Sequence, residues 1–254
     1  MIESQKTGKS LNLTELEFWD RYWSAKKEIS HTWIPHRYLF TDVLSRMFTV
    51  NPEGRFLEIG GFPGFYSIWF TKYLCYHSSL IDIYLMPEIV DSLTQVNGTA
   101  PITLLQGDIF SFNPSEKYDV VMSAGLIEHF ADLPAIVERH GLCLHEGGKL
   151  IICVPNFLGL NGLLQKLLDR NNYEAHNLAA MDIKTMRTVL KDQGFKDINA
   201  SYYGGFGIWI EEAKFSSPTL AWILKILNYA RVPFNIIGLN TRFFSPYIMY
   251  TATR

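Results

Sequence analysis

Residues 56–64, with the sequence FLEIGGFPG, combine one acid with three closely spaced glycines. The apolar residues before the glycines are typical of a short buried strand, and the apolar spacing over 65–72 predicts a helix directly after them. Glycines at a strand-to-helix turn let the backbone approach a ligand, and free N–H groups at the helix start attract anionic or carboxylate groups. The stretch therefore predicts a site for a nucleotide-like cofactor.

Two later acids also follow predicted strands. Asp82 lies near the end of a strand predicted over 79–84 and comes 22 positions after Gly60, while Asp108 follows a strand predicted over 102–105. In a doubly wound sheet, an acid about 20 residues after the glycine turn can accept hydrogen bonds from ribose hydroxyls. We therefore expect Asp82 to hold a ribose, and a solvated loop aspartate is the alternative.

The glycine stretch resembles the first motif of class I S-adenosylmethionine-dependent methyltransferases, which reads acid-x-Gly-x-Gly-x-Gly. The chain matches this motif from Glu58 to Gly64, with Phe62 at the position of the second glycine. The later strand ends and the loop Leu126–His129 also fit the family in order and spacing. The resemblance covers 56–156 and implies S-adenosylmethionine as the cofactor.

The resemblance also implies roles for individual residues. Asp82 would accept hydrogen bonds from the ribose, Asp108 would accept one from the adenine amino group, and Ile109 would pack on the adenine ring. The residues expected to contact the cofactor are Glu58, Gly60, Gly61, Gly64, Asp82, Ile83, Asp108, Ile109 and Ser123.

A histidine in the same loop is the candidate for catalysis. By resemblance His129 faces the substrate, and a side chain that titrates near neutral pH can remove the proton from an oxygen nucleophile. His176 is the second candidate. The alternative for His129 is a histidine at a helix start that is hydrogen-bonded to the backbone.

A metal ion is not expected from the same loop. Some ubiquinone-pathway relatives carry a further acid three residues before the Glu-His pair and use that set for a divalent metal. Gly125 occupies this position here. The sequence therefore predicts no metal site.

Composition narrows the class of partner. The chain has 254 residues, 48% of them hydrophobic, with a net charge of −2 and a pI near 6.4, so nothing in its charge favours nucleic acid. Three distant cysteines match no disulfide framework or zinc pattern. The polar start, residues 1–10, and the lack of a run of about 18 apolar residues predict a cytoplasmic protein.

The pattern of strands and helices predicts one α/β domain over 1–254. By resemblance, the fold is a doubly wound, Rossmann-like sheet of seven strands, mostly parallel with an antiparallel last strand. The N-terminal part, which carries Tyr22 and Trp23, is expected to form a helical cover with one helix that begins near Pro35. The four expected parts are the N-terminal helical cover (1–50), the cofactor-binding core (51–156), a cover segment over the pocket (157–180) and an apolar helical insert before the last strand (204–243).

The insert is the most individual part of the sequence. From 218 to 239 it is apolar except for Lys225, Asn228 and Arg231, which form one narrow polar stripe on a predicted helix. Such a helix needs a partner over most of its surface. It could pack on the domain, form a homodimer, or lie peripherally on a membrane.

The predicted function is methyl transfer from S-adenosylmethionine to a small-molecule or lipid-like acceptor, at oxygen. One alternative is a methyltransferase-fold scaffold or membrane-bound partner without activity, because Phe62 could crowd the cofactor. A nicotinamide-dependent oxidoreductase is a further alternative. It shares the strand-turn-helix, but Phe62 breaks its glycine fingerprint and it does not explain Glu58, Asp108 or the pair of Glu128 and His129.

Overall fold

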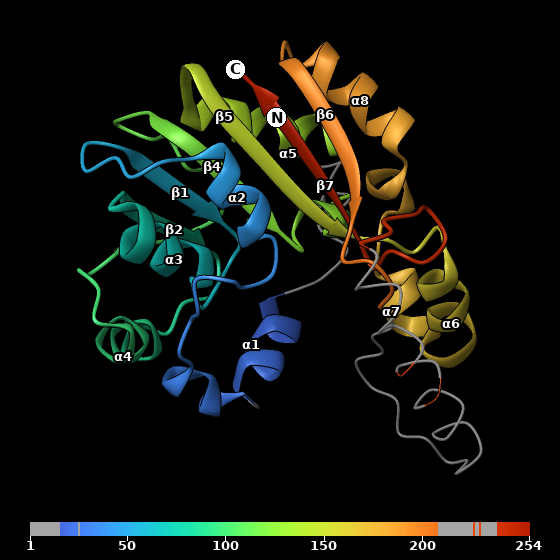
Figure 1. Cartoon of the computed structure of the whole chain (residues 1–254), viewed down its shortest axis with the longest axis horizontal. Helices are drawn as coiled ribbons and strands as arrows, with labels where there is room; N and C mark the ends of the chain where they lie inside the picture. Colours follow the sequence, from blue (N-terminus) through green and yellow to red (C-terminus); the bar gives the residue numbers. More distant parts are fainter. Residues whose placement is uncertain (1–15, 25, 208–225, 227–228, 230–237) are drawn as a thin grey trace, which may run out of the picture.

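One mixed sheet forms the centre of the computed structural model, which describes residues 16–24, 26–207, 226, 229 and 238–254 (Figure 1). Its strand order is β3-β2-β1-β4-β5-β7-β6, with β7 antiparallel to both neighbours and the other pairs parallel. The predicted seven-stranded, mostly parallel sheet with an antiparallel last strand is confirmed. The strands are β1 (Arg55–Ile59), β2 (His77–Asp82), β3 (Thr103–Gln106), β4 (Tyr118–Ala124), β5 (Leu144–Pro155), β6 (Lys196–Tyr203) and β7 (Tyr247–Thr253).

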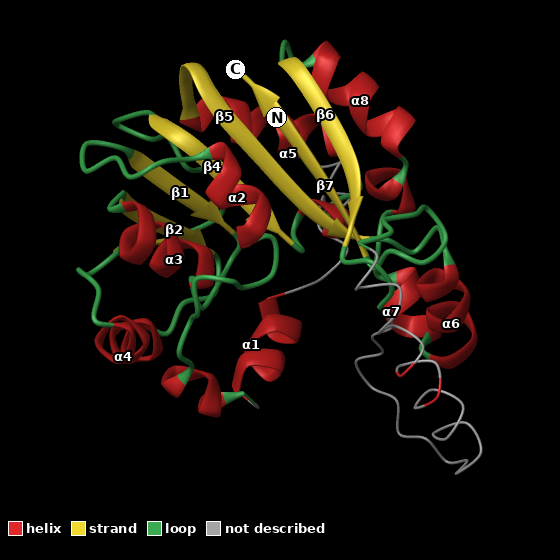
Figure 2. Cartoon of the chain, in the orientation of Figure 1, coloured by secondary structure: helices red, strands yellow, loops and turns green. Residues whose placement is uncertain are grey.

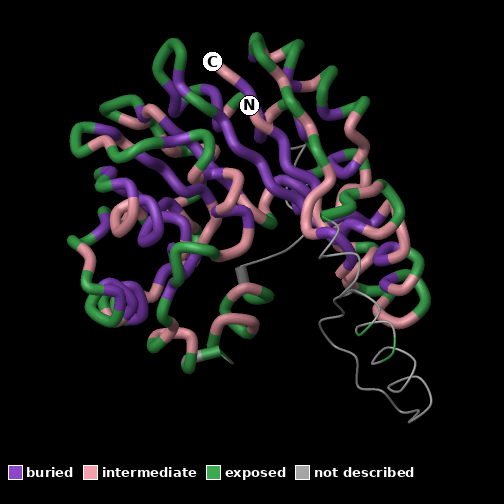
Figure 3. The backbone as a smooth tube through the Cα atoms, in the orientation of Figure 1, coloured by how far each residue is buried: buried purple, intermediate pink, exposed green. Residues whose placement is uncertain are grey.

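Helices cover both faces of this sheet (Figure 2). The helices α2 (Thr41–Met47), α3 (Phe65–Leu74) and α4 (Pro87–Asn97) share one buried cluster with the strands. The helices α5 (Leu133–Cys143) and α8 (Ile183–Asp192) share the cluster on the other face. Figure 3 shows the strands as the buried centre between these layers. This arrangement is the doubly wound fold that the sequence predicts.

Shorter helices lie beyond the carboxyl ends of the parallel strands (Figure 1). The N-terminal part contributes α1 (Leu16–Ser24) and the 3₁₀ turn η1 (Lys27–His31), and the loop after β4 forms the turn η2 (Ile127–His129). The segment after β5 forms α6 (Leu160–Leu168), α7 (Arg170–Glu174) and η3 (Leu178–Met181). The helices that follow the neighbouring strands β1 and β4 lie on opposite faces of the sheet, and ligands of doubly wound folds bind at such a point.

The helix predicted to begin near Pro35 is shorter than expected. It begins only at Thr41, because Phe40 has a φ of 67°, a left-handed conformation that an α-helix does not contain. Phe40 is 2% exposed, and its N–H donates to the hydroxyl oxygen of Tyr203 at 3.1 Å. Tertiary packing therefore fixes this turn. The predicted insert at 204–243, including its polar stripe, lies mostly outside the described residues.

Candidate active site

The glycine-rich turn between β1 and α3 is built around a buried carboxylate. Glu58 is 2% exposed, and its Oε2 accepts a hydrogen bond from the backbone N–H of Ser67, in the first turns of α3, at 2.7 Å. A Cβ on Gly61 would lie 2.2 Å from Oε1 of Glu58, so this position has room for glycine only. Burial raises the pKa of Glu58 to about 7, although the hydrogen bonds with Ser67 lower it.

The same turn also meets the loop after β4. Gly60 has a φ of 63°, and a Cβ there would lie 2.4 Å from Cδ1 of Leu126. The close approach brings the backbone of the turn next to the loop that carries Glu128 and His129. Gly60 therefore serves both the conformation of the turn and the contact between two loops.

Asp82 links the glycine-rich turn to the end of β2. Its Oδ2 accepts a hydrogen bond from the N–H of Phe62 and its Oδ1 accepts one from the N–H of Tyr84, both at 3.0 Å. Burial raises the pKa of Asp82 to about 6. Both hydrogen bonds orient the carboxylate, and each oxygen keeps a lone pair for a ligand hydroxyl.

A single cavity of about 400 Å³ runs along this edge of the sheet. Its wall includes seven of the nine residues predicted to contact the cofactor: Glu58, Gly60, Gly61, Asp82, Ile83, Asp108 and Ile109. The Oδ1 of Asp108 accepts a hydrogen bond from the N–H of Phe110 at 2.9 Å, which fixes the loop after β3. The volume lies within the range of small-molecule sites, about 300–1,000 Å³.

Two predicted contact residues lie outside the cavity wall. Ser123 is 1% exposed and its hydroxyl hydrogen-bonds Nε2 of His140 on α5 at 2.9 Å, so its side chain faces the helical layer. The next residue along β4, Ala124, lines the cavity instead. Gly64 has a φ of 92°, and a Cβ there would meet Ile102 and Leu80 at 3.2 Å, so it permits close packing of α3 on the sheet.

Aromatic side chains of α1 close the cavity on one side. Phe18, Trp19, Tyr22 and Trp23 all line it. The ring of Trp23 meets that of Phe62 edge to face at 5.1 Å between centroids. Phe62 is 3% exposed and belongs to the core cluster on the α3 face, so its ring packs into the wall and leaves the cavity open.

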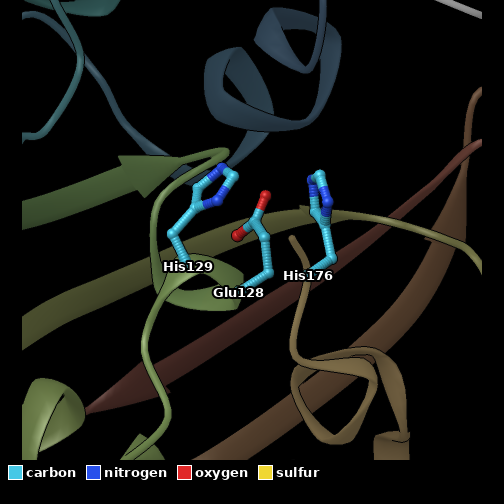
Figure 4. Close-up of side chains that lie close together, drawn as sticks. All are labelled: Glu128, His129 and His176. Carbon is cyan, nitrogen blue, oxygen red and sulfur yellow. The ribbon is translucent and has the colours of Figure 1, made fainter. Parts of the chain in front are cut away.

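Three polar side chains gather on the part of the cavity wall that the loop after β4 and the cover segment form. Glu128 and His129 come from η2, and His176 comes from the segment between α7 and η3 (Figure 4). One side-chain ligand atom of each lies within 4.8 Å of the other two. We refer to these residues as the Glu-His-His cluster. The sequence predicted His129 and His176 as separate candidates, and the structure brings them together with Glu128.

Burial dominates the electrostatics of the Glu-His-His cluster. It raises the pKa of Glu128 to about 8 and lowers the pKa of His129 to about 3, with the neighbouring His176 as a second cause for His129. Burial also lowers the pKa of His176. Among the described residues, Oε2 of Glu128 and Nδ1 of His129 have no hydrogen-bond partner. Two buried polar atoms are thus available to a ligand.

Backbone contacts join the cover segment to the loop after β4. The N–H of Asn177 donates to the carbonyl of Glu128 at 2.6 Å, and its Nδ2 donates to the carbonyl of Phe130 at 2.9 Å. The ring of His176, next to Asn177, lies 4.7 Å from that of His129 between centroids. Asn177 therefore holds the two halves of the Glu-His-His cluster at a fixed separation.

Comparison with known families decides the class of this protein. Residues 32–200, more than half of the chain, match the model of a methyltransferase domain family. The chain belongs to this methyltransferase family. No curated protein matches the sequence.

Solved structures share the fold of the methyltransferase. A putative methyltransferase of Haloferax volcanii, solved with the Trm112 methyltransferase activator, has a TM-score of 0.61 and 15% identity and covers 94% of this chain and 97% of its own. Phosphoethanolamine N-methyltransferase 2 of Haemonchus contortus, solved with S-adenosyl-L-methionine, has a TM-score of 0.58 and 19% identity. The match covers 94% of this chain and 59% of the Haemonchus chain. An S-adenosylmethionine-dependent methyltransferase of Archaeoglobus fulgidus has a TM-score of 0.55 and 17% identity and covers 94% and 100%. At these sequence identities, the similarity shows only that the fold is shared.

The resemblance to class I S-adenosylmethionine-dependent methyltransferases is thereby confirmed, and the protein is an enzyme of this class with S-adenosylmethionine as its methyl donor. The nicotinamide-dependent alternative is wrong. The inactive-scaffold alternative depended on Phe62 crowding the cofactor, and that side chain packs into the wall instead.

Several residues of the methyltransferase cavity carry no sequence motif. They are Tyr38, Tyr66, Cys153, Asn172 and Tyr247. Tyr247 opens β7 opposite Pro155, the last residue of β5. Pairing the predicted last strand against β5 could have placed Tyr247 at the cavity, because antiparallel register puts the start of one strand at the end of the other. The others depend on how the covering segments pack.

Proposed function

We propose that the enzyme transfers the methyl group of S-adenosylmethionine to an oxygen atom of a small, largely apolar acceptor. One observation carries the proposal: a single cavity joins the residues predicted to hold the cofactor to the Glu-His-His cluster. The acceptor must then lie between the methyl group of the donor and these polar side chains. The further role of each predicted cofactor residue stays a prediction.

The reaction needs mainly positioning. The acceptor oxygen attacks the methyl carbon in line, the sulfur–carbon bond breaks, and its electron pair returns to sulfur to give S-adenosylhomocysteine. The hydroxyl proton must leave, and the side chains near it decide how. The sequence predicts that His129 accepts this proton; Nδ1 of His129 is buried and without a partner in the described residues. Activation of the acceptor by the Glu-His-His cluster is our proposal.

The cavity wall favours an uncharged, aromatic or lipid-like acceptor. Its polar side chains are acids, histidines, tyrosines and one asparagine, and no lysine or arginine is among the described residues that line it. A phosphorylated acceptor would need cationic partners. The aromatic side chains of α1 that line the cavity instead offer apolar contact area to an acceptor.

A matched pair of acceptors tests the proposal. The enzyme is incubated with methyl-labelled S-adenosylmethionine and either an alkylphenol or the aniline of the same shape, with phosphoethanolamine as a third acceptor. We expect label on the phenol oxygen and little on the other two. Transfer to nitrogen alone would overturn the assignment to oxygen and leave the methyltransferase class intact.

A further inference from the structure

The Glu-His-His cluster has the composition of a metal site. It offers two imidazole nitrogens and one carboxylate oxygen, with these atoms within 4.8 Å of one another (Figure 4). A set of two imidazoles and one carboxylate binds zinc and other divalent transition metals in preference to magnesium or calcium. An ion at about 2.0–2.2 Å from each atom would draw the three side chains together by a small rotamer adjustment.

Backbone contacts leave one nitrogen of each histidine available. Nδ1 of His176 lies 2.6 Å from the carbonyl oxygen of Asn172, so Nδ1 carries the proton and Nε2 keeps its lone pair. In His129, Nδ1 is the atom without a partner, and the ring has a backbone hydrogen bond with Ala175. Metal-binding histidines commonly donate their other ring N–H to a backbone carbonyl in this way.

Buried atoms without partners provide the second observation. Glu128 is 1% exposed and His129 is 8% exposed, yet Oε2 of the first and Nδ1 of the second find no hydrogen-bond partner in the described part of the chain. Burying such atoms without a partner is unfavourable, because they lose their hydrogen bonds to water. A bound cation would satisfy both atoms at once.

We propose that Glu128, His129 and His176 bind one divalent transition-metal ion, with an open coordination position toward the cavity. The prediction of no metal considered only the loop after β4, where Gly125 replaces a third ligand. His176 supplies the third ligand from the cover segment, 47 positions after His129. Three protein ligands with one open position are typical of catalytic zinc sites.

This ion would give the cluster a role in the proposed O-methylation. Only that role, and not the metal site itself, rests on the proposed function. A hydroxyl that binds at the open position has a lowered pKa and loses its proton to solvent. The resulting oxyanion attacks the methyl carbon as described above, and His129 then acts as a ligand rather than as the proton acceptor.

Cobalt is the probe for this site, because Co²⁺ bound to nitrogen and oxygen ligands absorbs visible light. Protein treated with a chelator is titrated with Co²⁺ in the absence of any acceptor, so the result does not depend on the proposed function. We expect one equivalent to bind with an absorption band that Zn²⁺ abolishes. His176→Ala should weaken binding at least 10-fold, while His77→Ala, at an exposed histidine on β2, should leave it unchanged.

Two further measurements make the outcome decisive. Titration of the His176→Ala variant with S-adenosylmethionine checks that its fold and cofactor end are intact. Glu128→Gln, which keeps the size of the side chain, should weaken Co²⁺ binding in the same direction. Absence of a stoichiometric cobalt band in the unmodified enzyme, or a band equally strong in His176→Ala, would overturn the proposal.

Discussion

Asp82 fixes the glycine-rich turn and is also the residue predicted to bind the ribose of the cofactor. Its two oxygens accept N–H groups from Phe62 and Tyr84, and burial raises its pKa to about 6. In the proposed complex the same carboxylate accepts the ribose hydroxyls. The residue therefore organises the site before the cofactor arrives, which reduces the cost of binding.

Asp82→Asn should weaken the binding of S-adenosylmethionine by about 10- to 100-fold, since a hydrogen bond to a charged group contributes about 1.5–3 kcal/mol. Calorimetric titration measures the dissociation constant. Asp91→Asn, the same exchange at an exposed position of α4, is the control and should bind like the unmodified enzyme. Equal affinity in all three proteins would show that Asp82 does not hold the ribose.

Glu58 makes stability depend on pH. Its pKa rises from 4.5 to about 7 on folding because of burial, so the folded chain binds the extra proton between these values and stability falls as pH rises through this window. Glu58→Gln lacks this pH dependence, because an amide does not bind the proton. Between pH 4.5 and 8, the free energy of unfolding of the unmodified enzyme without cofactor should fall by roughly 3 kcal/mol more than that of the variant.

Urea unfolding at several pH values measures this difference. Asp82 and Glu128 also have raised pKa values, but both proteins contain them, so their effect cancels in the comparison. A constant difference between the two proteins from pH 4.5 to 8 would contradict the assignment to Glu58.

Sequence reasoning at this scale succeeded where a motif fixes backbone and side chain together. Seven predicted cofactor residues line the cavity because strand ends in a parallel sheet meet at one edge. The side chain of Ser123 does not line the cavity, because the pattern predicts the strand but not that the hydroxyl of Ser123 hydrogen-bonds the buried His140 on α5. Gly64 matches the motif yet packs α3 on the sheet.

At the scale of elements, α1 contacts two different parts of the cavity wall. Trp19 meets His129 of the Glu-His-His cluster edge to face at 5.3 Å, and Trp23 meets Phe62 of the glycine-rich turn at 5.1 Å. Trp19→Ala should raise the KM for the acceptor about 10-fold and leave cofactor affinity unchanged, because a half-buried aromatic contact that contributes about 1 kcal/mol is lost only beside the Glu-His-His cluster.

Trp23→Ala, on the same helix, is the matched variant. It should lower the affinity for S-adenosylmethionine and leave the KM for the acceptor nearly unchanged. Steady-state kinetics with a methyl acceptor and calorimetry with the cofactor separate the two effects. Loss of both properties in both variants would mean that α1 acts only as a scaffold.

The cover segment depends on Asn177. Its Nδ2 donates to Phe130 and its Oδ1 accepts from the N–H of Ala179 at the start of η3. Asn177→Ala should destabilise the enzyme by about 1–3 kcal/mol and speed amide hydrogen exchange over 170–181, since the hydrogen bonds of this side chain are lost. Asn171→Ala, at an exposed position of α7, is the control. Unchanged exchange in the first variant would contradict this role.

Elements with strong local signals were predictable and those fixed by packing were not. The apolar runs correctly predicted the strand before the glycine-rich turn and those near 79–84 and 102–105, and the resemblance correctly predicted seven strands. The pattern could not show that Phe40 adopts a left-handed conformation, because a contact with Tyr203, far along the chain, stabilises it. The helices of the cover segment lacked a periodic signal strong enough to predict.

At the scale of the whole molecule, helices cover both faces of one sheet (Figures 1 and 3), and the cavity lies where α1 and the segment after β5 meet the strand ends. No helix among the described residues is long and apolar enough to cross a bilayer. Homodimer formation or peripheral membrane contact through 218–239 stays a prediction, as does the cytoplasmic location.

Calorimetric titration with S-adenosylmethionine, beside NAD, tests the central claim most directly. The unmodified enzyme should bind one equivalent of the methyl donor and no NAD, because the cavity carries the residues of a methyltransferase and Phe62 replaces the second glycine of a dinucleotide site. Gly60→Arg should abolish binding, since its side chain meets Leu126 at the cavity wall. Folded enzyme that binds neither ligand, or binds NAD alone, would contradict the account.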